Sequence, residues 1–170
     1  ILGFDADEAA VENLREELGL NSPLMVRYFN WLSDIARGDL GNSIGYKKPV
    51  SEIIGSSISP TISITILSLL ISVLVSMPLG ITAALKHNKK ADLLITSVSQ
   101  VGVVLPSFWL GIILLLIFSQ NLKKFPYGSY TYLNEDFFGW VKSIFLPSLS
   151  LGLISSAVLT RVIRSAVLEN

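Results

Sequence analysis

Cysteine is absent from the 170-residue sequence. Its absence excludes disulfides, thiolate zinc sites, iron–sulfur clusters and cysteine nucleophiles. Charge is also scarce, because 15% of the residues are charged, against about 25% in an ordinary soluble domain. The 13 basic and 13 acidic residues cancel, and without a basic excess we expect no nucleic-acid partner.

Several catalytic motifs are missing as well. The sequence has no G-x-x-x-x-G-K-[ST] phosphate loop, so we expect no ATP hydrolysis by this chain itself. It also has no G-x-G-x-x-G motif, no H-E-x-x-H motif, no paired carboxylates and no nucleophile–base set. We therefore expect a protein that is not an enzyme and that holds no cofactor and no metal.

Long uncharged runs are the main positive feature of the sequence. No charged residue occurs over 53–85, 93–122 or 143–160. A helix that crosses the hydrocarbon core of a membrane needs about 20 apolar residues, which the first two runs exceed and the third nearly reaches. The sequence therefore predicts an all-α, polytopic membrane protein with three spans, at about 60–85, 93–119 and 144–160.

The residues before the first span are amphipathic and too polar to cross a membrane. Asp5 or Asp7 can cap a first helix that ends at Gly19. A second helix is expected to start at Pro23 and to end before the next turn-rich stretch. A short third helix over 50–58 then leads into the first span.

The distribution of basic residues predicts which side each segment occupies. Residues 86–92 and 161–170 lie on the same side of three spans and together carry five Lys or Arg. Because basic residues in short loops favour the cytoplasm, we expect an external segment over 1–59 and a transmembrane domain over 60–170. The external segment would have neither a span nor a signal peptide before it, so we expect a fragment of a longer protein.

Small and hydroxyl-bearing residues form a stripe along the first span. They recur at steps of three or four, which keeps them on one helical face: Thr61, Thr65, Ser68, Ser72, Ser76, Gly80 and Ala84. Such residues let helices approach closely in lipid. We favour a packing face, and the alternative is that part of the stripe lines a polar pathway.

Two polar or helix-breaking positions interrupt the second span. Gln100 is expected to pair with a neighbouring helix or to face the pathway. Pro106 removes an intrahelical hydrogen bond and is expected to kink or break the span, and Ser107 beside it is a further candidate for packing or for the pathway. No ionisable residue lies within a predicted span, which argues against proton-driven transport. His87, in a lysine-rich loop, is expected to be solvated and inert.

An ordered set of short motifs resembles a known family. In chain order the motifs are LREELGLNSPL (14–24), YFNWL (28–32), GDLGNS (38–43), PV (49–50), PLG (78–80), LPSFWLG (105–111), LPSLSLG (146–152) and TRVIR (160–164). Together they resemble the permeases of dipeptide, oligopeptide and nickel ABC importers. The match is to the first of the two permeases, which has a large external segment.

The resemblance implies a type I ABC importer transmembrane domain in the bacterial plasma (inner) membrane, with about three of its spans present. It implies a second permease, two ATPase subunits, an external solute-binding protein and the lipid membrane as partners. Dipeptides, oligopeptides, nickel and metal chelates all stay open as substrates. The family's coupling helix would follow residue 170, so Arg161, Arg164 and Glu169 are expected to form the approach to it.

Two further alternatives stay open at this point. Arg161 and Arg164, three residues apart on one helical face, either extend to lipid phosphates or orient the coupling segment. The chain could also be a membrane assembly or anchoring subunit without transport, or part of a secondary transporter.

Overall fold

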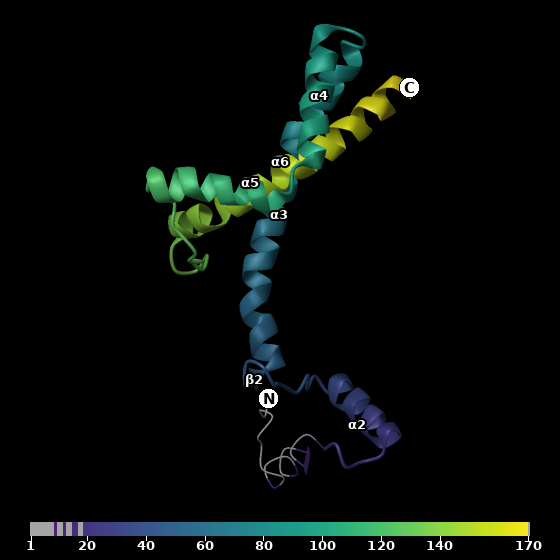
Figure 1. Ribbon diagram of the computed structural model, residues 1–170, viewed down its shortest axis with the longest axis vertical. Helices are drawn as coiled ribbons and strands as arrows, with labels where there is room; N and C mark the ends of the chain where they lie inside the picture. Colours follow the sequence, from purple (N-terminus) through teal and green to yellow (C-terminus); the bar gives the residue numbers. More distant parts are fainter. Residues whose placement is uncertain (1–8, 10–11, 13–14, 17–18, 170) are drawn as a thin grey trace. The chain divides into compact units, whose positions relative to one another are not determined.

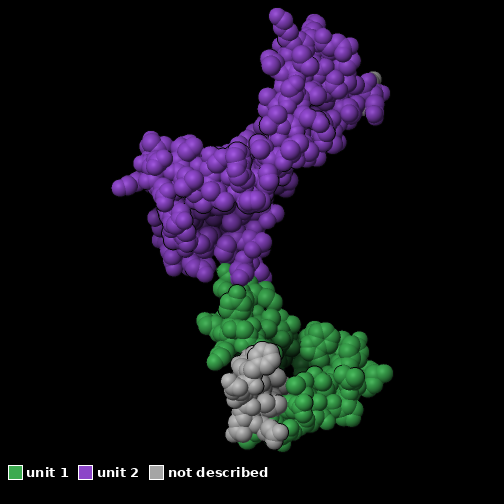
Figure 2. All heavy atoms as spheres, viewed as in Figure 1, with its two compact units in different colours: residues 1–56 green, residues 57–170 purple. Residues whose placement is uncertain are grey.

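The computed structural model describes residues 9, 12, 15–16 and 19–169 (Figure 1). The chain divides into two compact units, residues 1–56 and residues 57–170 (Figure 2). The predicted helix start at Asp5 or Asp7 lies outside the described residues. Gly19 lies within them, and its φ of +62° is the left-handed conformation that commonly ends a helix.

The described part of the first unit includes a 13-residue helix and a small hairpin. The predicted second helix is confirmed as α2 (Leu24–Ala36), and Gly38 follows it with a φ of +86°. Strands β1 (Asn42–Ser43) and β2 (Lys48–Pro49) then pair antiparallel. Gly38 supports the turn because glycine adopts positive φ without a steric penalty.

Helix α3 (Val50–Leu85) runs without a break through Pro60. The prediction of a separate short helix over 50–58 followed by a span was therefore wrong. Pro60 lacks an N–H group, but neighbouring hydroxyls support the backbone around it, since Thr61 Oγ1 donates to the Ser57 carbonyl at 2.7 Å. Prolines are tolerated in apolar helices where such side chains satisfy backbone groups.

The predicted second span is broken, as expected, at Pro106. Helix α4 (Lys90–Val104) ends there, and α5 (Ser107–Leu114) continues into the π-helix η1 (Leu115–Asn121). The two halves are bent by 96°. Leu105 is extended, with φ −74° and ψ 127°, because proline disfavours the helical conformation of the residue before it. Among the described residues, α3 and α6 are long and apolar enough to span a membrane, and the bent pair makes a third candidate.

Helix α6 (Phe137–Glu169) is longer than the span predicted over 144–160. Residues 161–169 are helical, so Arg161 and Arg164 lie on a helix, as expected, and α6 continues beyond the end of the predicted span. The helix also passes through Pro147. In the last turns of α6, Arg164 is held by a partner on α4.

Helix α6 is the packing centre of the second unit. It contacts α4 and α5 (Figure 1), and it crosses α3 at two glycines. A β-carbon added at Gly80 would lie 2.8 Å from Ile163 Cβ, and one at Gly152 would lie 2.8 Å from Ile71 Cβ. The contacts advance in the same direction on both helices, so α3 and α6 run parallel. Small residues therefore allow the two backbones to approach closely.

Candidate functional site

A buried carboxylate on the first turn of α4 is paired with an arginine of α6. The Asp92 side chain is 6% exposed and the Arg164 side chain 24%. Arg164 Nε donates to Asp92 Oδ1 at 2.6 Å, and Nη2 donates to Oδ2 at 2.8 Å. This two-pronged contact uses the planar guanidinium fork, which adds geometric specificity to the charge attraction.

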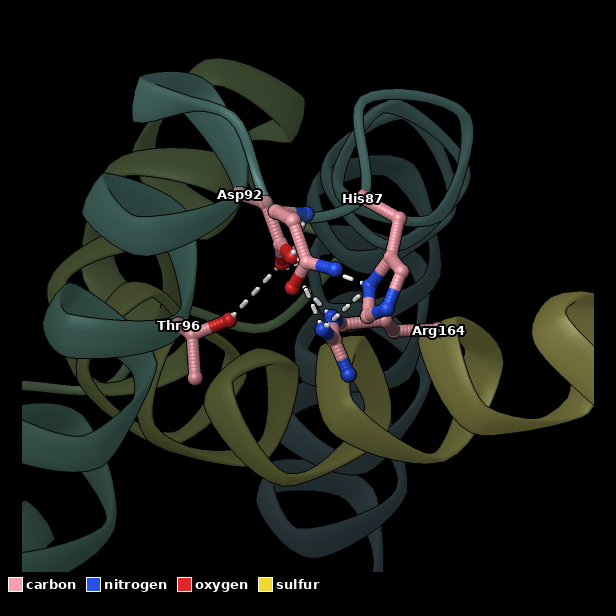
Figure 3. A network of polar contacts seen from close by, with 5 residues as sticks. His87, Asp92, Thr96 and Arg164 are labelled. Carbon is pink, nitrogen blue, oxygen red and sulfur yellow. Dashed lines mark hydrogen bonds and ion pairs between the residues drawn. The ribbon is translucent and has the colours of Figure 1, made fainter.

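Further donors surround the carboxylate (Figure 3). The backbone N–H of Asn88 donates to Asp92 Oδ2 at 3.0 Å, and Thr96 Oγ1 donates to Oδ1 at 3.2 Å. Asn88 has a φ of +60°, a conformation in which asparagine is enriched. The turn before α4 thereby presents its N–H to the carboxylate.

The prediction that His87 is inert was wrong. Its Nδ1 lies 3.1 Å from Arg164 Nη2 and 3.3 Å from Asp92 Oδ2, and its side chain is 47% exposed. As a neutral imidazole, it can accept from the arginine through this nitrogen. His87 therefore belongs to the network, because the turn between α3 and α4 brings it over the ion pair (Figure 3).

The network connects three segments: the turn after α3, the first turn of α4 and the last turns of α6. Removing one partner of a buried ion pair leaves an uncompensated charge, which costs about 3–5 kcal/mol. The pair therefore fixes how the end of α6 sits against the turn. The predicted spans themselves contain no ionisable residue, but Asp92 lies in α4 directly before the second span predicted over 93–119.

The other predicted coupling residues lie elsewhere on α6. Arg161 and Glu169 line a shallow depression on the helix together with Val158, Val162, Ser165 and Ala166. Arg161 Nε is buried and has no hydrogen-bond partner among the described residues. The structure therefore brings Arg164, but neither Arg161 nor Glu169, to the carboxylate of Asp92.

The hydroxyl stripe of α3 lies partly against α6. Ser72 and Ser76 are buried, and across the interface Ser148 Oγ donates to the Ile64 carbonyl at 3.4 Å. Ser68 Oγ instead donates to the carbonyl of Thr65 within α3 itself. The middle of the stripe thus sits in the contact between the two helices.

A mostly apolar cavity of about 550 Å³ lies between α3, α4 and α6. Its walls include Val75, Leu79, Val98, Leu153, Ser156 and Thr160. The predicted pathway residues Thr65, Ser68, Ser72, Ser76, Gln100, Pro106 and Ser107 are not among its lining residues. Gln100 is exposed, and its amide makes no hydrogen bond to the described residues. These residues therefore do not gather around one cavity.

Neutral side chains hold the opposite end of the second unit together. The hydroxyl of Tyr130 lies 2.9 Å from Ser59 Oγ, and Trp140 Nε1 donates to Ser63 Oγ at 3.2 Å. These contacts attach the loop before α6 to the first part of α3. Sequence reasoning missed this cluster because its members are far apart in the chain.

Asp92 was the main residue that sequence reasoning missed. Its sequence signal was slight: Thr96 stands four residues later, so the two side chains share one face of α4. That spacing does not reveal the arginine, which lies 72 residues away along the chain. A lone aspartate after a lysine-rich turn reads as an ordinary solvated residue until the helices are packed.

Comparisons with known proteins place the chain among transport proteins. Residues 76–170 match the family described as the binding-protein-dependent transport system inner membrane component. The chain is 34% identical over 169 residues to a probable peptide ABC transporter permease protein of Sinorhizobium fredii. It is 36% identical over 165 residues to an oligopeptide transport system permease protein of Bacillus subtilis. It is 33% identical over 190 residues to a probable D,D-dipeptide transport system permease protein of Escherichia coli.

These three alignments cover nearly all of this chain but only part of each relative. They include 99%, 95% and 99% of the chain, and 54%, 52% and 56% of the respective relatives. The chain therefore spans about half the length of the curated relatives it matches.

Proposed function

The chain belongs to the family of binding-protein-dependent transport system inner membrane components, and on that premise we propose that it is a permease subunit of an ATP-driven peptide importer. The predicted resemblance and the all-α type I importer transmembrane fold are confirmed by this membership. Peptides come first as substrates because the names of the relatives specify peptides, oligopeptides and dipeptides. Nickel and metal chelates are the second substrate class.

The proposed assembly contains several other proteins. A second permease forms the pathway with this one, two ATPase subunits hydrolyse ATP, and an external solute-binding protein delivers the substrate. In the bacterial inner membrane, residues 1–59 lie outside, and residues 86–92 and 161–170 lie in the cytoplasm. The permease contributes a pathway and helix packing that can adopt two arrangements.

The observation that carries this proposal is the contact between Asp92 and Arg164. It links the end of α6, the proposed approach to a coupling segment, to the turn between α3 and α4. A displacement of that end by the ATPase subunits would therefore move two helices together. Arg164 is the coupling residue, whereas Arg161 and Glu169 lie on a part of the helix available to neighbouring subunits.

The test is substrate-stimulated ATP hydrolysis by the full assembled complex. Arg164→Ala is expected to abolish most of the stimulation. Arg164→Lys is expected to restore it only in part, because a lysine cannot bridge both carboxylate oxygens in the same plane. Arg37→Ala, which removes an exposed arginine on the other unit, is the matched control and should leave stimulation unchanged.

Loss of assembly must be separated from loss of coupling. The double variant Asp92→Asn/Arg164→Gln removes both charges and keeps groups able to form hydrogen bonds. If it assembles and still lacks stimulation, the coupling role is supported. Unchanged stimulation in assembled Arg164→Ala would show that the arginine has no part in coupling.

Substrate class is tested by uptake into cells that lack the native importer. Cells supplied with the full-length permease and its partner genes should take up a radiolabelled dipeptide or oligopeptide. Uptake of radioactive nickel without peptide uptake would show that the metal alternative is correct. A complex with neither activity would contradict the proposed importer.

A further inference from the structure

Two lysines beside the Asp92 network remain without a counter-charge. Lys89 and Lys90 are exposed and form no ion pair among the described residues. Asp92 is the carboxylate nearest to the two lysines in the sequence. Its oxygens already accept hydrogen bonds from Arg164, Thr96 and the turn backbone. The two ammonium groups are therefore available to an external anion.

The lysines border a cavity of about 460 Å³. Asp92, Arg164 and Thr96 form part of its polar wall, and Leu93 forms an apolar part. Because Asp92 is neutralised by Arg164, Lys89 and Lys90 leave this cavity with a positive charge. A cavity of this kind favours a negatively charged group such as a phosphate.

Exposed apolar side chains lie close in sequence to these two lysines. Leu93 and Leu94 are 70% and 65% exposed, and Leu85, at the end of α3, is 75% exposed. A free phosphate ion would make no use of these side chains, whereas a lipid would place its acyl chains along them. Arg164, which the sequence offered as a lipid contact, is occupied by Asp92 and leaves that role to the lysines.

We propose that Lys89 and Lys90, with the cavity between the α3–α4 turn and α6, bind the phosphate of an anionic membrane lipid. The apolar run of α4 begins at Leu93, so the two ammonium groups lie at the level of the headgroups. Basic pockets between membrane helices are suited to such headgroups. The inference goes beyond transport and does not require that the proposed substrate be correct.

The experiment uses the full-length permease purified with its partner subunits in a neutral detergent. Native mass spectrometry measures binding of added phosphatidylglycerol, with phosphatidylethanolamine as the comparison of zero net charge. Lys89→Gln/Lys90→Gln is expected to weaken phosphatidylglycerol binding about thirtyfold at low salt, from the usual contribution of two basic residues at an anionic surface. Lys89→Arg/Lys90→Arg should retain binding because it keeps both charges.

The chain supplies a matched control at the opposite end of the bent helix pair. Lys123→Gln/Lys124→Gln removes the same charge from another adjacent lysine pair and should leave phosphatidylglycerol binding unchanged. Equal losses in both double variants, or no loss in either, would overturn the proposal. The Arg variant and intact assembly of the Gln variant exclude a general folding defect as the cause of weakened binding.

Two more outcomes distinguish other ligands. Displacement of phosphatidylglycerol by inorganic phosphate would show a site for a small anion and overturn the lipid assignment. Loss of the ATPase subunits from Lys89→Gln/Lys90→Gln, with lipid binding intact, would show a protein contact and also overturn it. Peptide uptake is measured separately, so failure of this proposal and failure of the proposed transport function give different results.

Discussion

At one end of the helical unit over 57–170, a carboxylate and a guanidinium connect the helices, whereas at the other end a phenol, an indole and serine hydroxyls do so. The charged end has two short, directional contacts between Asp92 and Arg164. The neutral end has longer contacts around Tyr130 and Trp140. A neutral hydrogen bond contributes about 0.5–1.5 kcal/mol, much less than the cost of leaving a buried charge without its partner.

This difference indicates where the unit tolerates change. A neutral cluster can lose one hydrogen bond and keep its packing. The ion pair is more demanding, because separating the two groups leaves the nearly buried Asp92 carboxylate without its counter-charge. We therefore expect the Asp92 end to move as one piece and the Tyr130 end to adjust locally.

The largest expected contrast concerns the side of the membrane on which each end lies. A cysteine introduced at Ser129, beside Tyr130, should react with an impermeant thiol reagent on intact cells. A cysteine at Lys86, beside His87, should react only after the membrane is opened. Both positions are exposed in the folded chain, and the reverse labelling would contradict the proposed orientation of the two ends.

The next largest effect is expected at the charged end itself. Arg164→Ala should destabilise the assembled permease more than the substitutions below, because Asp92 is left without its counter-charge. The measurement is thermal unfolding of the purified complex. Asp92→Asn/Arg164→Gln should recover part of the lost stability. If the double variant is no more stable than Arg164→Ala, the unpaired charge is not the cause of the lost stability.

A smaller effect is expected between the two ends, where α3 and α6 cross. Gly152→Ala should destabilise the complex by about 1–3 kcal/mol through overpacking, since its β-carbon would meet Ile71 and the Ser68 carbonyl. Gly55→Ala is the matched control because nothing lies within 4 Å of the β-carbon it would add. That control should be neutral or stabilising, as alanine is the better helix former. Equal effects on thermal unfolding would show that the crossing is not tightly packed.

The smallest effect is expected at the neutral end. Tyr130→Phe removes hydrogen bonds to Ser59 and Ser63 and should cost about 1 kcal/mol. The thermal unfolding temperature should therefore fall only slightly, and substrate-stimulated ATP hydrolysis should stay unchanged. If Tyr130→Phe lowered the stability as much as Arg164→Ala, the two ends would not differ in the way proposed.

Some of the fold could be predicted because its causes are local. The uncharged runs predicted the apolar helices, Pro106 predicted the break between α4 and α5, and Gly38 marked the end of α2. The ends of the helices were harder to predict from the sequence, because they depend on tertiary partners. The third span was predicted to end at residue 160, yet residues 161–169 extend α6 by more than two turns, with Arg164 held by Asp92.

The site was predictable only in part. Arg164 was chosen for its position near the proposed coupling segment, and the structure gives it a partner on α4. His87 was set aside as solvated and Asp92 was not singled out, because neither lies in an apolar run. Their role appears only when the turn after α3 is placed against α6.

The sequence by itself determined that this chain is helical, that it is apolar enough for a membrane, that it breaks at Pro106 and that it resembles importer permeases. These properties follow from composition, helical period and ordered motifs, which act over a few residues. The tertiary structure alone decided that Asp92 pairs with Arg164 and that Lys89 and Lys90 form no ion pair among the described residues. The two residues of the Asp92–Arg164 pair lie 72 positions apart in the sequence. The packing of α3, α4 and α6 brings them together, and a buried charge requires such a partner.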